Sequence, residues 1–257
     1  MVHPGLQEVQ ELGSSRVGAM MRKQNAILLF SKPPRISRTN LDEPYAKLPW
    51  DDLDALFTGL LGDLLEQACR LKDVDVLLFR KKSELSDDFL LPFQNRVKRF
   101  DEAHGSFTEN VQHAVDQAFA AHYHRIVVLI DNHPLIDAPF LARVVQQLAY
   151  EDDCVVVAPS LEGTCFLVGM KANHGSIFDR TDHDPLAKPY LLLKRLCRLE
   201  AMLFLTEPTY SLDSGSGLAR LKSQLDAADG SSPDFPRRTY EMFRTFDKKY
   251  PPKKATR

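Results

Sequence analysis

The sequence predicts an α/β fold with a mainly parallel β-sheet. Three observations lead to this expectation: short apolar runs of strand length, amphipathic segments with helical spacing between them, and helix-capping residues where those segments begin. Alternating strands and helices imply β–α–β crossovers, which make neighbouring strands parallel. The 257 residues are 44% hydrophobic and 26% charged, an ordinary globular composition that allows one large α/β domain or two small ones.

The strands are predicted where an apolar run is bounded by turn residues. In chain order these runs cover residues 26–30, 74–79, 125–130, 153–158, 165–170 and 202–206. The run at 125–130 is the strongest strand candidate in the chain. A short turn at 159–164 separates two of the runs, so an antiparallel pair or a β-bend is expected there.

The helices are predicted from apolar residues that recur at i, i+3, i+4 and i+7. The expected helices cover approximately residues 53–68, 106–119, 137–148, 186–199 and 215–225. Ser106 and Glu109 have the spacing of a capping box, and Asp137 is positioned to cap the third helix. No regular element is expected at 80–105, where the sequence is polar and charged.

The expected domain organisation has three parts. Residues 1–24 are polar and lack the apolar core of a secretory signal, so they are expected to form a flexible leader. Residues 25–228 are expected to form the folded domain. Glycine, serine and proline then interrupt the pattern, so a linker with one short helix near 240–246 and a basic tail is expected over 229–257.

Composition and charge argue against several function classes. The formal net charge of −2 gives no indication of nucleic-acid or membrane-surface binding. No apolar run approaches the roughly 20 residues needed to span a bilayer. The four cysteines lie far apart without a CxxC pair, so neither a zinc site nor a disulfide framework is expected. These features fit a reducing, cytoplasmic location and leave the oligomeric state open.

A basic loop follows the first predicted strand. Lys32, Arg35 and Arg38 lie in it, and Pro33 and Pro34 stiffen it because each proline fixes its own φ and restricts the preceding residue. Ligands of open α/β sheets collect beyond the carboxyl ends of the strands. The three cations are therefore candidates for binding the phosphates of a ligand. The alternative interpretation is a proline turn with solvated cations.

A second candidate site follows the strand at 125–130. Asp131 lies directly after that strand and Asn132 follows it. A carboxylate in this position can bind a sugar hydroxyl or a metal ion, and Mg²⁺ and Mn²⁺ prefer oxygen ligands. The alternative is simple turn chemistry, for which Asp-Asn-His-Pro is well suited.

Two further carboxylates follow strands. Glu162 lies in the turn at 159–164, next to Gly163, which can adopt a positive φ or let the backbone approach a ligand closely. A plain tight turn is the alternative. Asp213 follows the last predicted strand and could instead be the N-cap of the last helix.

Four segments together carry a family resemblance. They are Phe30-Ser-Lys-Pro-Pro-Arg, Leu129-Ile-Asp-Asn-His-Pro, the segment 158–169, and Ser211-Leu-Asp-Ser. They resemble the F-A-K-P-P-R, G-S-D-C-P, G-P-A-x-D-G-G-Y-Y-L-I-G and D-V-D-T motifs of a small bacterial family in the GT-A superfamily. Its members are glycosyltransferase-like proteins of unassigned function. They are related in fold to nucleotidyltransferases that attach guanylate to molybdenum cofactor or to phospholactate. The resemblance covers about residues 25–226.

The resemblance implies a GT-A-like three-layer sandwich and a transferase that binds a nucleotide or nucleotide sugar, for glycosyl or nucleotidyl transfer. By the same resemblance, the three cations of the basic loop hold phosphates, and Asp131 or Asn132 helps to hold Mg²⁺ or Mn²⁺. Glu162 contacts the acceptor or the donor sugar, and Asp213 is a late metal or acceptor contact. Catalysis would come from positioning and from neutralising the leaving diphosphate.

The chain also departs from the family motifs. The family's K-T-R-L run corresponds to the neutral and acidic segment 39–42, and its S-D-C-P aspartate corresponds to Asn132. The family's D-G-G becomes Glu162-Gly163-Thr164. An amide cannot offset the charge of Mg²⁺. The departures suggest altered or lost catalysis, and they favour the alternative of a non-catalytic GT-A-like binding or scaffold protein that acts through a partner.

Overall fold

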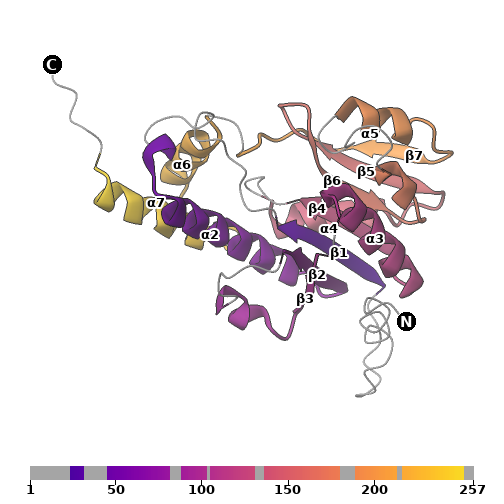
Figure 1. Ribbon diagram of the computed structural model, residues 1–257, viewed down its shortest axis with the longest axis horizontal. Coiled ribbons are helices and arrows are strands. Elements are labelled where there is room, and N and C mark those ends of the chain that lie inside the picture. The colour runs from indigo at the N-terminus through magenta and orange to yellow at the C-terminus, as the bar shows by residue number, and fades with distance from the viewer. Residues whose placement is uncertain are drawn as a thin grey trace.

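The computed structural model describes residues 24–31, 45–81, 88–102, 105–130, 136–179, 189–212 and 216–251. Helices cover both faces of a seven-stranded sheet (Figure 1). The strands are β1 (Asn25–Ser31), β2 (Val74–Arg80), β3 (Val97–Asp101), β4 (Arg125–Ile130), β5 (Cys154–Pro159), β6 (Cys165–Met170) and β7 (Met202–Leu205).

The sheet is mainly parallel, as predicted. The strand order is β3-β2-β1-β4-β6-β5-β7, and β6 runs antiparallel to both of its neighbours. The other neighbouring strands pair parallel. The antiparallel pair that the short turn at 159–164 predicts is therefore β5 and β6.

Six α-helices and three 3₁₀ helices are present among the described residues. The α-helices are α2 (Trp50–Cys69), α3 (Phe107–Ala120), α4 (Ala138–Gln147), α5 (Pro189–Leu196), α6 (Gly217–Ala227) and α7 (Arg237–Lys249). The 3₁₀ helices are η2 (Tyr45–Lys47), η3 (Asp88–Phe93) and η4 (Gly175–Phe178). Both predicted caps are confirmed: Ser106 and Glu109 form a capping box, and Asp137 Oδ1 accepts from the Phe140 N–H at 2.7 Å.

The three layers follow from the alternation of side chains along the strands. On one face of the sheet, Leu28 and Phe30 of β1 pack in a core with α3, α5 and η4. On the other face, Ile27 and Leu29 pack in a core with α2 and α4. Every residue of β1 is buried. A continuous apolar run is what a strand covered on both faces requires.

The region 80–105 differs from the expectation, because η3 and the edge strand β3 lie within it. In β3 only Val97 and Phe100 are partly buried, whereas Lys98 and Arg99 are exposed. Charged side chains are common on edge strands, where they discourage pairing with another chain. An edge strand of this kind lacks the apolar run from which the other strands could be predicted.

Helix α2 extends past the sheet. Its 20 residues span about 30 Å, whereas a strand of seven residues spans only about 23 Å. The second half of α2 packs on the sheet through residues such as Leu65. The first half carries Leu53 and Leu56 into a separate cluster with α6 and α7. Figure 1 shows α6 and α7 beside the end of α2 that lies away from the sheet.

Helix α7 is longer than the short helix expected near 240–246, and it packs along α2 instead of lying in an isolated linker. Its N-cap residue, Pro236, makes no side-chain capping hydrogen bond. Asp63 of α2 supplies the cap from across the interface, because its carboxylate accepts from the backbone N–H groups of Arg238 at 3.1 Å and Thr239 at 2.8 Å. The Thr239 hydroxyl donates to the same carboxylate at 2.7 Å. The predicted boundary of the domain at residue 228 stays a prediction.

Gly62 of α2 leaves room for the Arg238 side chain of α7. A Cβ atom on Gly62 would lie 2.9 Å from Cδ of Arg238, so any larger residue would force that side chain to move. Arg238 also forms an ion pair with Glu66, at 2.5 Å. None of the described helices has both the length and the apolar composition needed to cross a bilayer.

Candidate active site

The strand order reverses between β1 and β4. From β1 the sheet continues to β2 and β3 on one side, whereas β4 begins the other side. β1 and β4 pair in parallel register from Asn25–Arg125 to Phe30–Ile130, so the two strands end together. Open α/β sheets bind ligands at such a topological switch point, beyond the carboxyl ends of the strands.

The structure therefore places the starts of two predicted loops side by side. The basic segment follows Ser31 and the Asp-Asn segment follows Ile130, which are the last residues of the two strands. The predicted side chains themselves lie outside the described residues: Lys32, Arg35, Arg38, Asp131 and Asn132. Their proposed roles stay predictions.

The turn between β5 and β6 lies at the same edge of the sheet. Because β6 is antiparallel to β4, Leu129 near the end of β4 pairs with Leu167 near the start of β6. Within the turn, the Thr164 N–H donates to Oγ of Ser160 at 3.0 Å. Gly163 has φ 81°, as the glycine at this position predicts.

Glu162 is the only one of the predicted site residues that lies within the described part of the chain. Its side chain is on this turn, and its Oε2 accepts from the backbone N–H of Ser211 at 2.9 Å. Beside it, the Leu161 N–H donates to the Thr209 carbonyl at 2.7 Å. These bonds join the turn to the segment after β7. Glu162 therefore holds the chain that leads, through the buried Leu212, to Asp213.

Asp213 lies outside the described residues, but the residues before it fix the edge of the sheet from which it departs. β7 pairs parallel to β5, so its carboxyl end meets the β5–β6 turn. An isolated bridge between Ser160 and Thr209 extends that pairing. The four segments that carry candidate residues thus all begin at the same edge of the sheet.

The structure adds Arg80, which the sequence analysis missed. Arg80 ends β2 and pairs with Ser31 at the end of β1, so it lies where the basic segment begins. Its guanidinium is 5.2 Å from the ring centre of Phe89. In the first turns of α2, burial raises the pKa of Asp54, and the negative charge of Asp51 raises it further by a smaller amount. The positive charge of Arg80 acts in the opposite direction and lowers this pKa. The residue lies in a segment that gave no motif, so only its position at a strand end could have indicated it.

Asn110 is a second residue that the sequence analysis missed. The first turn of α3 lies over the end of β1, where the Phe107 and Phe30 rings meet edge to face with centres 5.7 Å apart. Asn110 follows one turn later and is 5% exposed, and its Nδ2 has no hydrogen-bond partner among the described residues. Buried amide donors are nearly always satisfied, so this atom calls for a ligand or a water molecule. In the sequence, Asn110 could have been noticed as a polar residue on the face of the predicted helix that is mainly apolar and buried.

A cavity of about 540 Å³ opens beside the β5–β6 turn, between α4 and the segment after β7. This volume is within the usual range for small-molecule sites. Its walls include the apolar Ile136 and Phe166 together with the charged Arg143 and Glu207. Among the described residues, no group of three or more His, Cys, Asp or Glu side chains is arranged to hold a metal ion.

Comparison with known proteins agrees with this architecture. A family model described as "Uncharacterized protein conserved in bacteria (DUF2064)" matches residues 64–183. No curated protein matches the chain. A solved structure from Desulfovibrio desulfuricans G20, provisionally named a nucleotide-diphospho-sugar transferase, has a TM-score of 0.68 at 18% identity. That alignment covers 88% of this chain and 96% of that chain.

Two more solved structures are similar at the level of the fold. A cytidylyltransferase from Leptospira borgpetersenii has a TM-score of 0.56 at 16% identity, over 88% of this chain and 94% of that chain. The 4-diphosphocytidyl-2C-methyl-D-erythritol synthase from Anaerococcus prevotii has a TM-score of 0.50 at 9% identity, over 82% of this chain and 100% of that chain. The predicted GT-A-like fold and the predicted resemblance are thereby confirmed. The chain has a GT-A-like fold, and its residues 64–183 match the family model of the uncharacterised bacterial proteins DUF2064.

Proposed function

We propose that this protein binds a nucleotide or nucleotide sugar and transfers a glycosyl or nucleotidyl group. The observation that supports this most strongly is the in-register end of β1 and β4 at the switch point of the sheet. In the sequence, a segment with three cations follows the first of these strands and Asp131 follows the second. The names of the structural neighbours, a nucleotide-diphospho-sugar transferase and a cytidylyltransferase, agree with this class of reaction.

The cations carry the phosphate contacts in this proposal. Lys32, Arg35 and Arg38 bind the diphosphate, and Arg80 adds a fourth cation beside the start of their loop. Bonds between such groups and phosphates are charge-assisted and are among the stronger hydrogen bonds in proteins. As the leaving diphosphate gains charge in the transition state, fixed cations stabilise it and so lower the barrier.

A divalent metal ion fits the remaining side chains. Asp131, or Asn132 through its carbonyl oxygen, would hold Mg²⁺ or Mn²⁺ together with Asp213, because these ions prefer oxygen ligands. The ion would neutralise the diphosphate. The strands before Asp131 and Asp213 end at the same edge of the sheet, which is the placement that this role requires.

Two further residues are assigned to the bound ligand. The Nδ2 of Asn110, which has no partner in the described part of the chain, donates a hydrogen bond to the nucleoside. Glu162 contacts the acceptor or the donor sugar with the oxygen that Ser211 does not occupy, while the other oxygen keeps its structural bond. The cavity beside the β5–β6 turn gives room for a bound donor sugar. The cytoplasmic location predicted from the sequence is part of this proposal.

The second candidate is a non-catalytic binding protein with the same scaffold. The sequence departures at Asn132 and at 39–42 favour it. The bond from Ser211 to Glu162 also favours it, because it gives the retained carboxylate a structural reason to be there.

A thermal-shift titration with a panel of nucleoside diphosphates, with and without Mn²⁺, tests the two candidates. A ligand that binds only the native state stabilises it, by about 2.7 kcal/mol at a concentration of 100 Kd. Stabilisation that depends on Mn²⁺ is the result expected for the transferase. Stabilisation that is equal without metal favours the binding protein. If no nucleotide raises the melting temperature, nucleotide binding is wrong.

Lys32→Ala tests the phosphate site, with Lys72→Ala as the matched control. Lys72 is exposed in the turn just before β2, at the opposite edge of the sheet. Loss of a charge-assisted contact costs about 1.5–3 kcal/mol, so nucleotide affinity of Lys32→Ala should fall roughly tenfold or more. Lys72→Ala should bind as the parent does. Equal affinities in both variants would show that the basic loop is not the phosphate site.

A further inference from the structure

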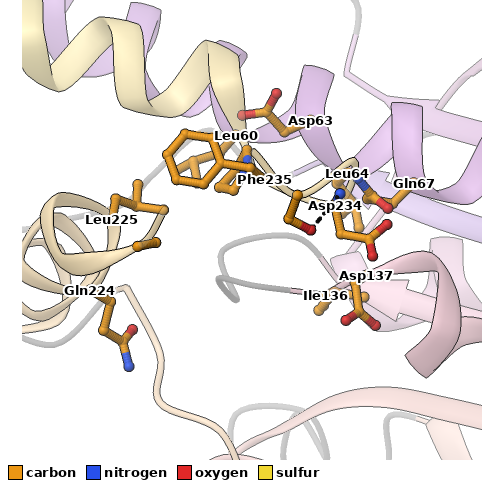
Figure 2. Close-up of a pocket in the computed structure, with 13 residues that line it drawn as sticks. Leu60, Asp63, Leu64, Gln67, Ile136, Asp137, Gln224, Leu225, Asp234 and Phe235 are labelled. Atoms are coloured by element: carbon orange, nitrogen blue, oxygen red, sulfur yellow. Dashed lines mark hydrogen bonds between the residues drawn. The ribbon is translucent and has the colours of Figure 1, made fainter. Parts of the chain in front are cut away.

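A second, smaller cavity lies between three helices that are far apart in the sequence. It has a volume of about 240 Å³ and lies between α2, the start of α4, the end of α6 and the segment 232–236. Figure 2 shows side chains from these four segments around one common space. Its apolar walls come from Leu64 of α2, Ile136 before α4, Leu225 of α6 and Phe235. The room corresponds to roughly eight water molecules at about 30 Å³ each.

The charged side chains among the cavity's described lining residues are all acidic, but two of the three are ion-paired: Asp63 with Arg238 at 3.4 Å and Asp234 with Arg70 at 2.7 Å. Asp137 forms no ion pair with the described residues, so it carries the unbalanced negative charge. Asp63 is fully engaged in capping α7, but Asp137 and Asp234 each have only Oδ1 occupied. Their Oδ2 atoms accept no hydrogen bond from the described residues. Gln67, which is 5% exposed, uses its Oε1 to accept from the Ala138 N–H at 3.1 Å and from Arg70 Nη1 at 3.4 Å, and its Nε2 makes no hydrogen bond with the described residues.

This chemistry selects the class of ligand. The Asp137 carboxylate beside the apolar space repels phosphates and other anions, and it attracts ammonium groups and accepts hydrogen bonds from hydroxyls. The cavity is therefore a poor site for a nucleotide diphosphate. An apolar body with one hydroxyl or ammonium group matches both parts of the lining.

We propose that the cavity between α2, α4 and α6 binds a small amphipathic amine or alcohol, and that this molecule is the acceptor of the transfer. Its identity as the acceptor rests on the function proposed above. The position supports it, because Ile136 and Asp137 directly follow the segment 131–135 that carries the candidate metal ligands.

The binding test uses three molecules of nearly the same size: benzylamine, benzyl alcohol and benzoate. Each is titrated into the full-length protein without nucleotide or metal, and binding is followed by ¹H–¹⁵N NMR. Benzylamine and benzyl alcohol are expected to bind weakly, with shifts at Leu64, Ile136 and Leu225. Benzoate is expected not to bind. If benzoate binds as tightly as benzylamine, or if neither benzylamine nor benzyl alcohol binds, the assigned ligand class is wrong.

Two variants locate the site. Ala228→Trp places an indole at the cavity wall, whereas Ala227→Trp makes the same change at an exposed position that does not line the cavity. Benzylamine affinity should fall roughly tenfold or more in Ala228→Trp and stay unchanged in Ala227→Trp. An equal loss, or no loss, in both would place the binding elsewhere.

Asp137→Asn tests the charge, because asparagine also caps helices well. Benzylamine should bind roughly two- to fivefold more weakly and benzyl alcohol equally well. A parallel loss for both molecules would contradict a role for the charge.

Nucleotide stabilisation of Ala228→Trp separates the two proposals, since it should match the parent if nucleotides bind at the switch point. Failure of the amine and alcohol to bind would leave that nucleotide result intact.

Discussion

The two halves of helix α2 pack in different ways. The second half buries Leu61 and Leu65 against the sheet, in a core that the strands themselves supply. The first half buries Leu53 and Leu56 against α6 and α7, which arrive from the other end of the chain. One helix therefore packs against both the sheet and an added helical layer.

This difference bears on the proposed function. The added layer stands beyond the carboxyl edge of the sheet, because α2 is longer than the strands that it covers. The 240 Å³ cavity lies between this layer and the body of the domain, with α2 as its floor. Loosening the contacts of the first half should therefore alter the proposed acceptor site and leave the sheet intact.

The largest effects are expected from deleting one buried leucine in each half. Leu65→Ala and Leu56→Ala each remove a fully buried side chain and should each lower the free energy of unfolding by about 2–5 kcal/mol. The expected difference is in what unfolds. Urea titrations followed by far-ultraviolet circular dichroism should show one shifted transition for Leu65→Ala and an early partial loss of helix for Leu56→Ala. Identical single transitions would show that the two halves unfold together.

The next effect concerns the Asp63 cap of α7. Asp63→Ala removes the acceptor of the Arg238 and Thr239 N–H groups and leaves the buried Thr239 hydroxyl without its partner. A loss of about 2–3 kcal/mol is expected, with faster tryptic cleavage at Arg237 and Arg238. Asp226→Ala, in an i,i+4 ion pair with Lys222 on the surface of α6, should change stability by less than about 1 kcal/mol. Equal proteolysis of both variants would contradict a capping role for Asp63.

The smallest effect is a pH dependence at the other end of α7. Lys249 and then Tyr250 donate to the Asp52 carboxylate, and these bonds lower the pKa of Asp52 below its ordinary value of 3.8. A lowered pKa in the folded state contributes stability that is present above pH 3.8 and is lost as the pH falls through the folded value. The stability difference between the parent and Asp52→Asn should thus be full at pH 7 and should shrink below pH 3.8.

Urea midpoints of both proteins between pH 7 and pH 3 measure this difference. Asp63 acts with the opposite sign, because its burial raises its pKa, so its own contribution is present at low pH and is lost as the pH rises. Because Asp63 is present in both the parent and Asp52→Asn, its contribution cancels in the stability difference, which then reports on Asp52 alone. A difference that grows as the pH falls would contradict the assigned sign.

Much of the fold could be predicted from the sequence alone. Apolar runs such as that of β4 and capping residues such as Ser106 act locally, so strands, helix starts and the parallel sheet follow from neighbours in the chain. The motifs that follow β1 and β4 indicated which edge of the sheet to consider. They also gave the family resemblance that the structural comparison supports.

Only the tertiary structure decided how the remaining parts meet. The cap of α7 comes from Asp63, 175 residues before Arg238, and the bond that holds the segment before Asp213 comes from Glu162, 49 residues before Ser211. Nothing local distinguishes these carboxylates from solvated ones, since their partners are backbone N–H groups that every residue has. The cavity between α2, α4 and α6 likewise depends on tertiary packing. It forms because α2 extends beyond the sheet and α6 and α7 pack against the extended part of α2.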